Sequence, residues 1–158
     1  MKNAKGFALL RIVFGLVWAV DAVFKWTPEI RLHITDVLTQ AQAGQPALEA
    51  AWINFWVHVA TLLDPVVFGC LIAVIETLLA LSLITGLFSR SIMYLGVAFA
   101  FMVWSVPQGF GGPYAPGATD IDSGIIYLLV FVALILGEAW KEYNLGSKLK
   151  LGCNCVTQ

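Results

Sequence analysis

Four long apolar runs, separated by short polar segments, organise this sequence. They cover residues 7–26, 66–88, 91–106 and 124–140. A helix of about 20 residues crosses the hydrocarbon core of a bilayer, so the first two runs are long enough to span it and the last two lie at the lower limit. The pattern predicts an all-α membrane protein, a bundle of four transmembrane helices.

The outer segment, residues 28–64, separates the first two runs and predicts helices outside the bilayer core. Within it, residues 47–63 are apolar but place three polar side chains on a single stripe of a helix. This amphipathic pattern favours a helix that lies in the membrane interface, where tryptophan is common. Another helix, over residues 31–43, is expected to precede it and to end before Pro46.

Charge predicts the orientation of the bundle. Seven of the nine basic residues fall on one side of a four-span topology, namely Lys2, Lys5, Arg11, Arg90, Lys141, Lys148 and Lys150. Cytoplasmic loops are rich in lysine and arginine, so we expect both termini in the cytoplasm and the protein in a prokaryotic cytoplasmic membrane. A fifth span at residues 47–63 would move Arg90 outside, which argues against it. Arg11 interrupts the first run and argues against a cleaved signal peptide.

Composition supports this class of protein and removes others. Of the 158 residues, 59% are hydrophobic and 12% are charged, and the mean hydropathy is +0.84. An average soluble domain has about 25% charged residues, so a soluble enzyme domain and a disordered chain are both disfavoured. A net charge of −1 gives no basic face for nucleic acid. The length suits a single membrane domain, residues 1–158, with a cytoplasmic tail over residues 141–158.

Glu76 is the most informative charged residue, because it lies near the middle of the second apolar run. An ionised carboxylate at the bilayer centre costs roughly 2.5–3.5 kcal/mol, so this side chain must face the bundle and either pair with a cation or stay protonated. Arg11 is the expected partner, at a depth that differs by roughly 10 Å. Two interpretations stay open: a structural ion pair between helices, or a site that handles a proton or a ligand.

Asp21 and Lys25 are four residues apart near the outer end of the first run. This spacing is typical of a helix-surface ion pair that contributes a few tenths of a kcal/mol. The alternative is that both side chains point into an outward-facing cavity between the helices.

The segment over residues 107–123 contains four glycines and three prolines, which predicts a turn-rich lid. Asp122 or Ser123 is expected to cap the helix that follows. Asp120 and Asp122, with scattered histidines, lack the spacing of a metal site, and no phosphate-binding, haem or flavin motif is present.

In the tail, Cys153 and Cys155 form a Cys-x-Cys pair, which is either two exposed thiols or a site for thiol exchange or soft metals.

Three segments together resemble the DoxX/DoxD family of small four-helix membrane proteins. They are LLRIVFGLVWAVDAVFKW in the first run, ETLLALSLITGLFSR in the second, and FGGPYAPGATDIDSGIIY in the lid. Arg11, Glu76 and Arg90 match the charged positions of the family, and Gly15, Gly86 and the Gly111–Tyr114 segment match the rest. The chain departs from the family at Asp21, in the outer segment over residues 28–64, and in its Cys-x-Cys tail.

The resemblance implies a subunit of a quinone-linked redox system, since DoxD-like proteins are the small subunit of thiosulfate:quinone oxidoreductase. Membrane quinone would be the substrate, thiosulfate or another small sulfur compound the donor, and a larger membrane complex the partner. Glu76 and Arg11 would be catalytic. The residues expected to bind substrate are Asp21, Lys25, Arg90, Tyr114 and Asp120. The alternatives are a non-catalytic accessory or assembly subunit and, third, a small transporter.

Overall fold

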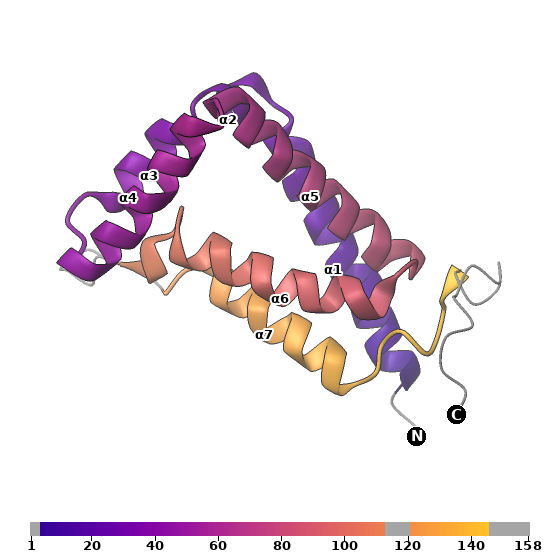
Figure 1. The fold of residues 1–158 in the computed structure, drawn as a ribbon. Helices are drawn as coiled ribbons and strands as arrows, with labels where there is room; N and C mark the ends of the chain where they lie inside the picture. The colour runs from indigo at the N-terminus through magenta and orange to yellow at the C-terminus, as the bar shows by residue number, and fades with distance from the viewer. Residues whose placement is uncertain (1–3, 113–120, 146–158) are drawn as a thin grey trace, which may run out of the picture.

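Seven α-helices and one short 3-10 helix make up the part of the chain that the computed structural model describes, residues 4–112 and 121–145 (Figure 1). In chain order the elements are α1 (Ala4–Lys25), α2 (Pro28–Leu32), α3 (Ile34–Gln42), α4 (Ala47–Leu62), α5 (Pro65–Thr85), α6 (Ser89–Ser105), η1 (Gly109–Gly111) and α7 (Ser123–Leu136). The described residues contain no β-strand. The all-α prediction is therefore confirmed.

The four apolar runs coincide with α1, α5, α6 and α7. By length and composition α1 and α5 are able to cross a membrane, with 22 and 21 residues, whereas α6 and α7 are shorter apolar helices. The fourth run was expected to continue to residue 140, but α7 ends at Leu136. Gly137 follows as its C-cap, and Glu138 then adopts a left-handed conformation with φ of 49°, which stops the helix.

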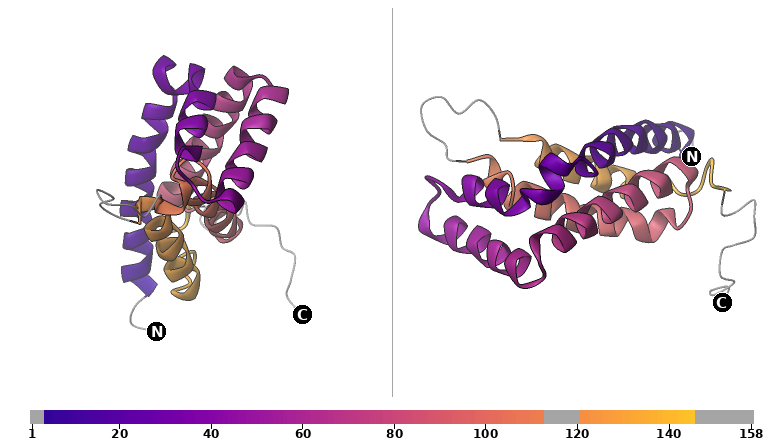
Figure 2. Two further views of the ribbon diagram at one scale, coloured as in Figure 1. Left: turned by 90° about the vertical axis from the view of Figure 1, so that its left-hand side faces the viewer. Right: turned by 90° about the horizontal axis from the view of Figure 1, so that it is seen from above.

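Two antiparallel helix pairs form the body of the molecule (Figures 1 and 2). Helix α1 packs along α5, and α6 packs along α7. In each pair, a glycine at the interface allows the two helices to approach closely. A Cβ atom on Gly15 would lie 2.9 Å from the Cβ of Leu83, and one on Gly96 would lie 2.2 Å from Cε1 of Phe131.

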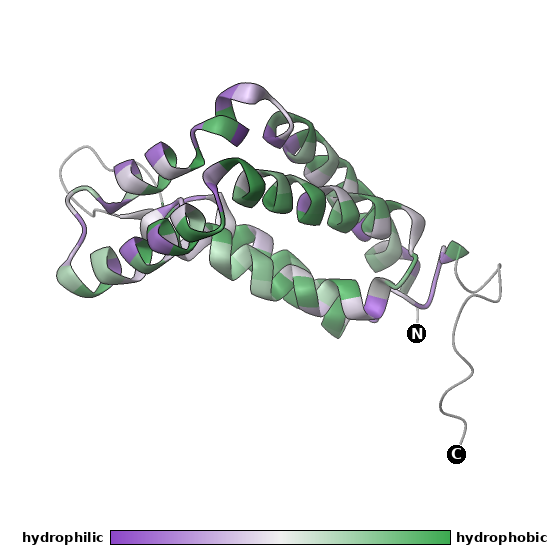
Figure 3. Ribbon diagram, turned by 45° about the horizontal axis from the view of Figure 1, so that its top comes forward, coloured by the Kyte–Doolittle hydropathy of each residue, from purple (hydrophilic) through white to green (hydrophobic). Residues whose placement is uncertain are grey.

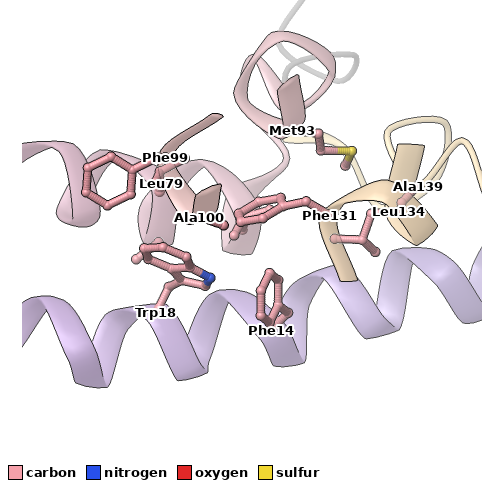
Figure 4. Packing of buried hydrophobic residues seen from close by; sticks show 11 residues of the cluster. Phe14, Trp18, Leu79, Met93, Phe99, Ala100, Phe131, Leu134 and Ala139 are labelled. Carbon is pink, nitrogen blue, oxygen red and sulfur yellow. The ribbon is translucent and has the colours of Figure 1, made fainter. Parts of the chain in front are cut away.

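Aromatic rings join the two pairs in the main core (Figure 4). Phe14 and Trp18 of α1 meet Phe131 of α7, with ring centroids 5.0 and 5.7 Å away from it. Phe99 of α6 lies 5.9 Å from Trp18. Edge-on and tilted contacts of this kind suit the charge distribution of aromatic rings. The core therefore ties α1 to the α6–α7 pair on the side away from α2, α3 and α4.

The outer segment folds as an arm of three helices. The helix expected over residues 31–43 is divided at His33, whose backbone (φ −113°, ψ 24°) separates α2 from α3. Helix α3 packs on α4, and the polar stripe of α4 is exposed, as its pattern predicts. Trp52 and Trp56 are part-buried and pack inward around Leu38, Ala60 and Val106. This second, small core joins the arm to Phe68 of α5 and Met102 of α6.

Candidate functional site

Glu76 is completely buried in the middle of α5. Its Oε1 atom lies 3.7 Å from Nζ of Lys25, the last residue of α1. Lys25 Nζ in turn donates a hydrogen bond of 3.3 Å to Oδ1 of Asp21. Neither carboxylate oxygen of Glu76 has a hydrogen-bond partner among the described residues. The three side chains therefore form a series in which the innermost carboxylate has a nearby cation but unused hydrogen-bonding capacity.

The register of α1 against α5 brings these side chains together. Next to Glu76, the hydroxyl of Thr77 accepts a 3.0 Å hydrogen bond from Nε1 of Trp26, so the C-terminal end of α1 lies at the level of the middle of α5. Both the ion pair and this hydrogen bond tie the end of α1 to the same turn of α5. As a result, Glu76 is close to the outer end of α1 and not to its middle.

The expected pairing of Arg11 with Glu76 is wrong. Arg11 is also completely buried, but its guanidinium donates hydrogen bonds of 3.0 and 2.8 Å to the carbonyl oxygens of Ala139 and Tyr143. A Cβ atom on Gly86 would lie 3.1 Å from Nη1 of Arg11. Gly86 is ten residues beyond Glu76, which is about 15 Å along a helix. Arg11 therefore holds the segment after α7 and belongs to a different part of the fold.

Asp21 and Lys25 do form the predicted i, i+4 pair, but Lys25 also faces Glu76 and lines a cavity. The helix-surface pair is therefore confirmed, and of the two side chains only that of Lys25 also lines a cavity. Asp21 stands behind Lys25 and is not among the residues that line the cavity.

The cavity has a volume of about 320 Å³ and lies between α5 and α6, with α3 and α4 on its other sides. Its walls are almost entirely apolar, with Phe68, Ile72 and Phe99 among the lining side chains. Lys25 and Glu76 are its charged lining residues. Pockets that hold small organic ligands have this size and this mixture of apolar walls and a few polar groups.

Trp56 of α4 also lines the cavity, and it carries a further polar group, its indole nitrogen. It is buried and has no hydrogen-bond partner among the described residues. Buried donors are nearly always satisfied, so a ligand or water that reached this N–H would gain a hydrogen bond. Sequence reasoning missed this group, because Trp56 was placed at the membrane interface. The packing of α4 on α3 places the side chain of Trp56 at the cavity wall.

The remaining predicted residues lie elsewhere. Arg90 is at the end of the molecule where Arg11 lies and places its guanidinium over Trp140, 5.6 Å from the ring centroid. Asp122 caps α7, as predicted, by accepting a 3.1 Å hydrogen bond from the backbone N–H of Ser123. Tyr114, Asp120 and the Cys-x-Cys tail are outside the described residues. Within the described ranges, no three His, Cys, Asp or Glu side chains gather as metal ligands do.

Comparisons with known protein families, with curated proteins and with solved structures find no match for this chain. The resemblance to the DoxX/DoxD family therefore stays a prediction that depends on the quoted segments. What the chain does has to be argued from the cavity and the side chains around it.

Proposed function

We propose that the chain is an integral membrane protein that binds a quinone in the cavity beside Glu76 and works in a quinone-linked redox system. The observation that carries this proposal is a largely apolar cavity of about 320 Å³ whose lining residues include Lys25 and the completely buried Glu76. The arrangement suits a ligand that is mostly apolar and has a few polar oxygens.

The exposed surface of the long helices supports a membrane location. On α1, Val20, Val23 and Leu9 are 60%, 68% and 59% exposed, and Leu129 on α7 is 59% exposed. Figure 3 shows that hydrophobic residues dominate the long helices and that polar residues are more frequent in the arm and the turns. Apolar faces of this extent are unusual on a soluble monomer and match what lipid tails require.

The polar groups of the cavity suit the chemistry of a quinone ring. Its carbonyl oxygens accept hydrogen bonds, and Lys25 and Trp56, which both line the cavity, carry N–H donors. Reduction to the quinol takes up two electrons and two protons. Glu76 is placed to supply a proton as a general acid. By the DoxD resemblance, the electrons come from thiosulfate or another small sulfur donor, with a partner protein in the membrane.

Binding of a short-chain ubiquinone analogue to the purified protein in lipid nanodiscs tests the proposal. Equilibrium dialysis is expected to give saturable binding at one site per chain. Glu76→Leu should weaken binding at least tenfold, because it removes the carboxylate from the cavity wall. The control is Asp36→Asn, which changes an exposed ion pair with His33 in α3 and should leave the affinity unchanged.

Absence of saturable binding to the unmodified protein would contradict the proposal. If the protein were then recovered from native membranes with a larger complex and no quinone, an accessory role would take its place. In that case the cavity would serve assembly and not chemistry.

A further inference from the structure

Asp21, Lys25 and Glu76 form a graded series between the surface and the cavity. Their side chains are 35%, 24% and 0% exposed, and the two gaps between their charged atoms are 3.3 and 3.7 Å. The outermost group is partly exposed one turn before the end of α1, the middle group lines the cavity, and the innermost group is completely buried. Each member can bind and release a proton.

No other titratable side chain interrupts the series inside the cavity. Among the lining residues contributed by α3, α4, α5 and α6, Glu76 is the only one that is titratable, and α1 contributes Lys25. On the neighbouring elements of the described chain, Asp36 pairs with His33 at the surface of α3, and His58 of α4 is exposed. Among the described residues that line the cavity, the side chains able to carry a proton are therefore those of Lys25 and Glu76.

The geometry also differs from that of a purely structural ion pair. A buried pair stabilises a fold only when its remaining hydrogen-bonding groups are satisfied, because desolvation of two charges is costly. Here Lys25 is shared between two carboxylates, and both oxygens of Glu76 lack hydrogen bonds among the described residues. A lysine that can rotate between two acids is suited to passing a proton from one to the other.

We infer that Asp21 and Lys25 form a proton path that refills Glu76 from the outer end of α1, an inference that rests on the proposed quinone binding. Protonated Glu76 gives its proton to a quinone oxygen as an electron arrives from the sulfur donor. The carboxylate then takes a proton from the ammonium of Lys25. The Asp21 carboxylate takes a proton from water, which leaves hydroxide, and passes that proton to the neutral amine, so that the ammonium of Lys25 and the carboxylate of Asp21 are both restored. Two passes deliver the two protons of the quinol.

Protein-film voltammetry of the short-chain ubiquinone analogue bound to the nanodisc-embedded protein tests this path without the natural electron donor. The unmodified protein should show a two-electron, two-proton wave. In Asp21→Asn and in Lys25→Met, proton delivery should limit the reduction, so the rate obtained from the peak separation at high scan rates should fall by about tenfold or more. Asp36→Asn, on the same outer side, is the matched control and should keep the original rate.

A second readout separates proton transfer from a structural effect. A small weak acid such as imidazole, added to the solution, should restore the rate of Asp21→Asn, because it replaces the missing surface donor. Lys25→Arg, which keeps the charge but holds its proton firmly, should bind the quinone and remain slow. A side chain that only supports the fold is not expected to show rescue by imidazole, or slow reduction with quinone binding intact.

Two outcomes would overturn the inference, and they differ. Unchanged rates in both Asp21→Asn and Lys25→Arg, with the quinone wave intact, would remove the proton path and leave quinone binding in place. Absence of any wave from bound quinone in the unmodified protein would overturn both the path and the proposed function.

Discussion

Lys25 at the end of α1 places its ammonium 3.7 Å from the carboxylate of Glu76 in the middle of α5. Both residues belong to helices that are long and apolar enough to cross a membrane. This contact brings a charged group from the end of one helix to the midpoint of the other. It also defines the polar end of the cavity, so it links the stability of the fold to the proposed chemistry.

The first prediction concerns the stability of this pair. Lys25→Met leaves a buried carboxylate without its cation and should lower the free energy of unfolding by about 2 kcal/mol, less than for a fully buried pair because Lys25 is partly exposed. The double variant Lys25→Met with Glu76→Gln should recover most of that loss, since no buried charge remains. Thermal unfolding in detergent, arranged as a double-mutant cycle, measures the coupling. Strictly additive effects would contradict a direct interaction.

The second prediction concerns Arg11. Arg11→Ala removes the donors to the carbonyls of Ala139 and Tyr143 and should cost about 2–3 kcal/mol, because buried acceptors lose their partners. Hydrogen exchange should become faster over residues 137–145, while quinone binding beside Glu76 stays unchanged.

Arg90→Ala is the control for this experiment. Arg90 is exposed and places its guanidinium over the face of Trp140, an interaction of about 0.5–1 kcal/mol. Loss of quinone binding in the Arg11 variant, with the bundle still folded, would show that Arg11 takes part in the site after all.

The third prediction concerns the close approach of α6 to α7. Gly96→Ala places a Cβ atom 2.2 Å from the ring of Phe131, and overpacking of this kind typically costs about 1–3 kcal/mol. Gly6→Ala is the matched control, because a Cβ atom there has nothing within 4 Å and alanine favours the helix by up to about 1 kcal/mol. Thermal unfolding of the two variants should shift in opposite directions. Equal shifts would argue against the packing between Gly96 and Phe131.

The fourth prediction concerns the cavity itself. Val59→Phe adds a ring to the α4 wall of the cavity and should weaken binding of the ubiquinone analogue at least tenfold, while the helix content measured by circular dichroism stays the same. Val20→Phe makes the same chemical change on the exposed face of α1 and should bind the quinone normally. Equal affinity of both variants would place the quinone elsewhere.

The helices themselves followed from local pattern. The apolar runs predicted α1, α5, α6 and α7, and the acidic cap of α7 at Asp122 was expected from its position before an apolar run. The local sequence is sufficient here, because a long apolar segment away from water can pair its backbone N–H and C=O groups within itself only as a helix. Pattern was less successful at boundaries that depend on single backbone conformations, such as the break at His33 and the early end of α7 at Leu136.

By itself the sequence determined the helical class, the four apolar helices, the exposed polar stripe of α4 and the position of Glu76 in the middle of an apolar helix. The tertiary structure alone decided that Lys25 and not Arg11 faces that carboxylate, that Trp56 turns inward, and that a cavity separates α5 from α6. The physical reason is register. How far one helix slides along another depends on side chains that meet across the interface, such as Gly15 against Leu83, and these contacts leave no mark in the periodicity of either helix.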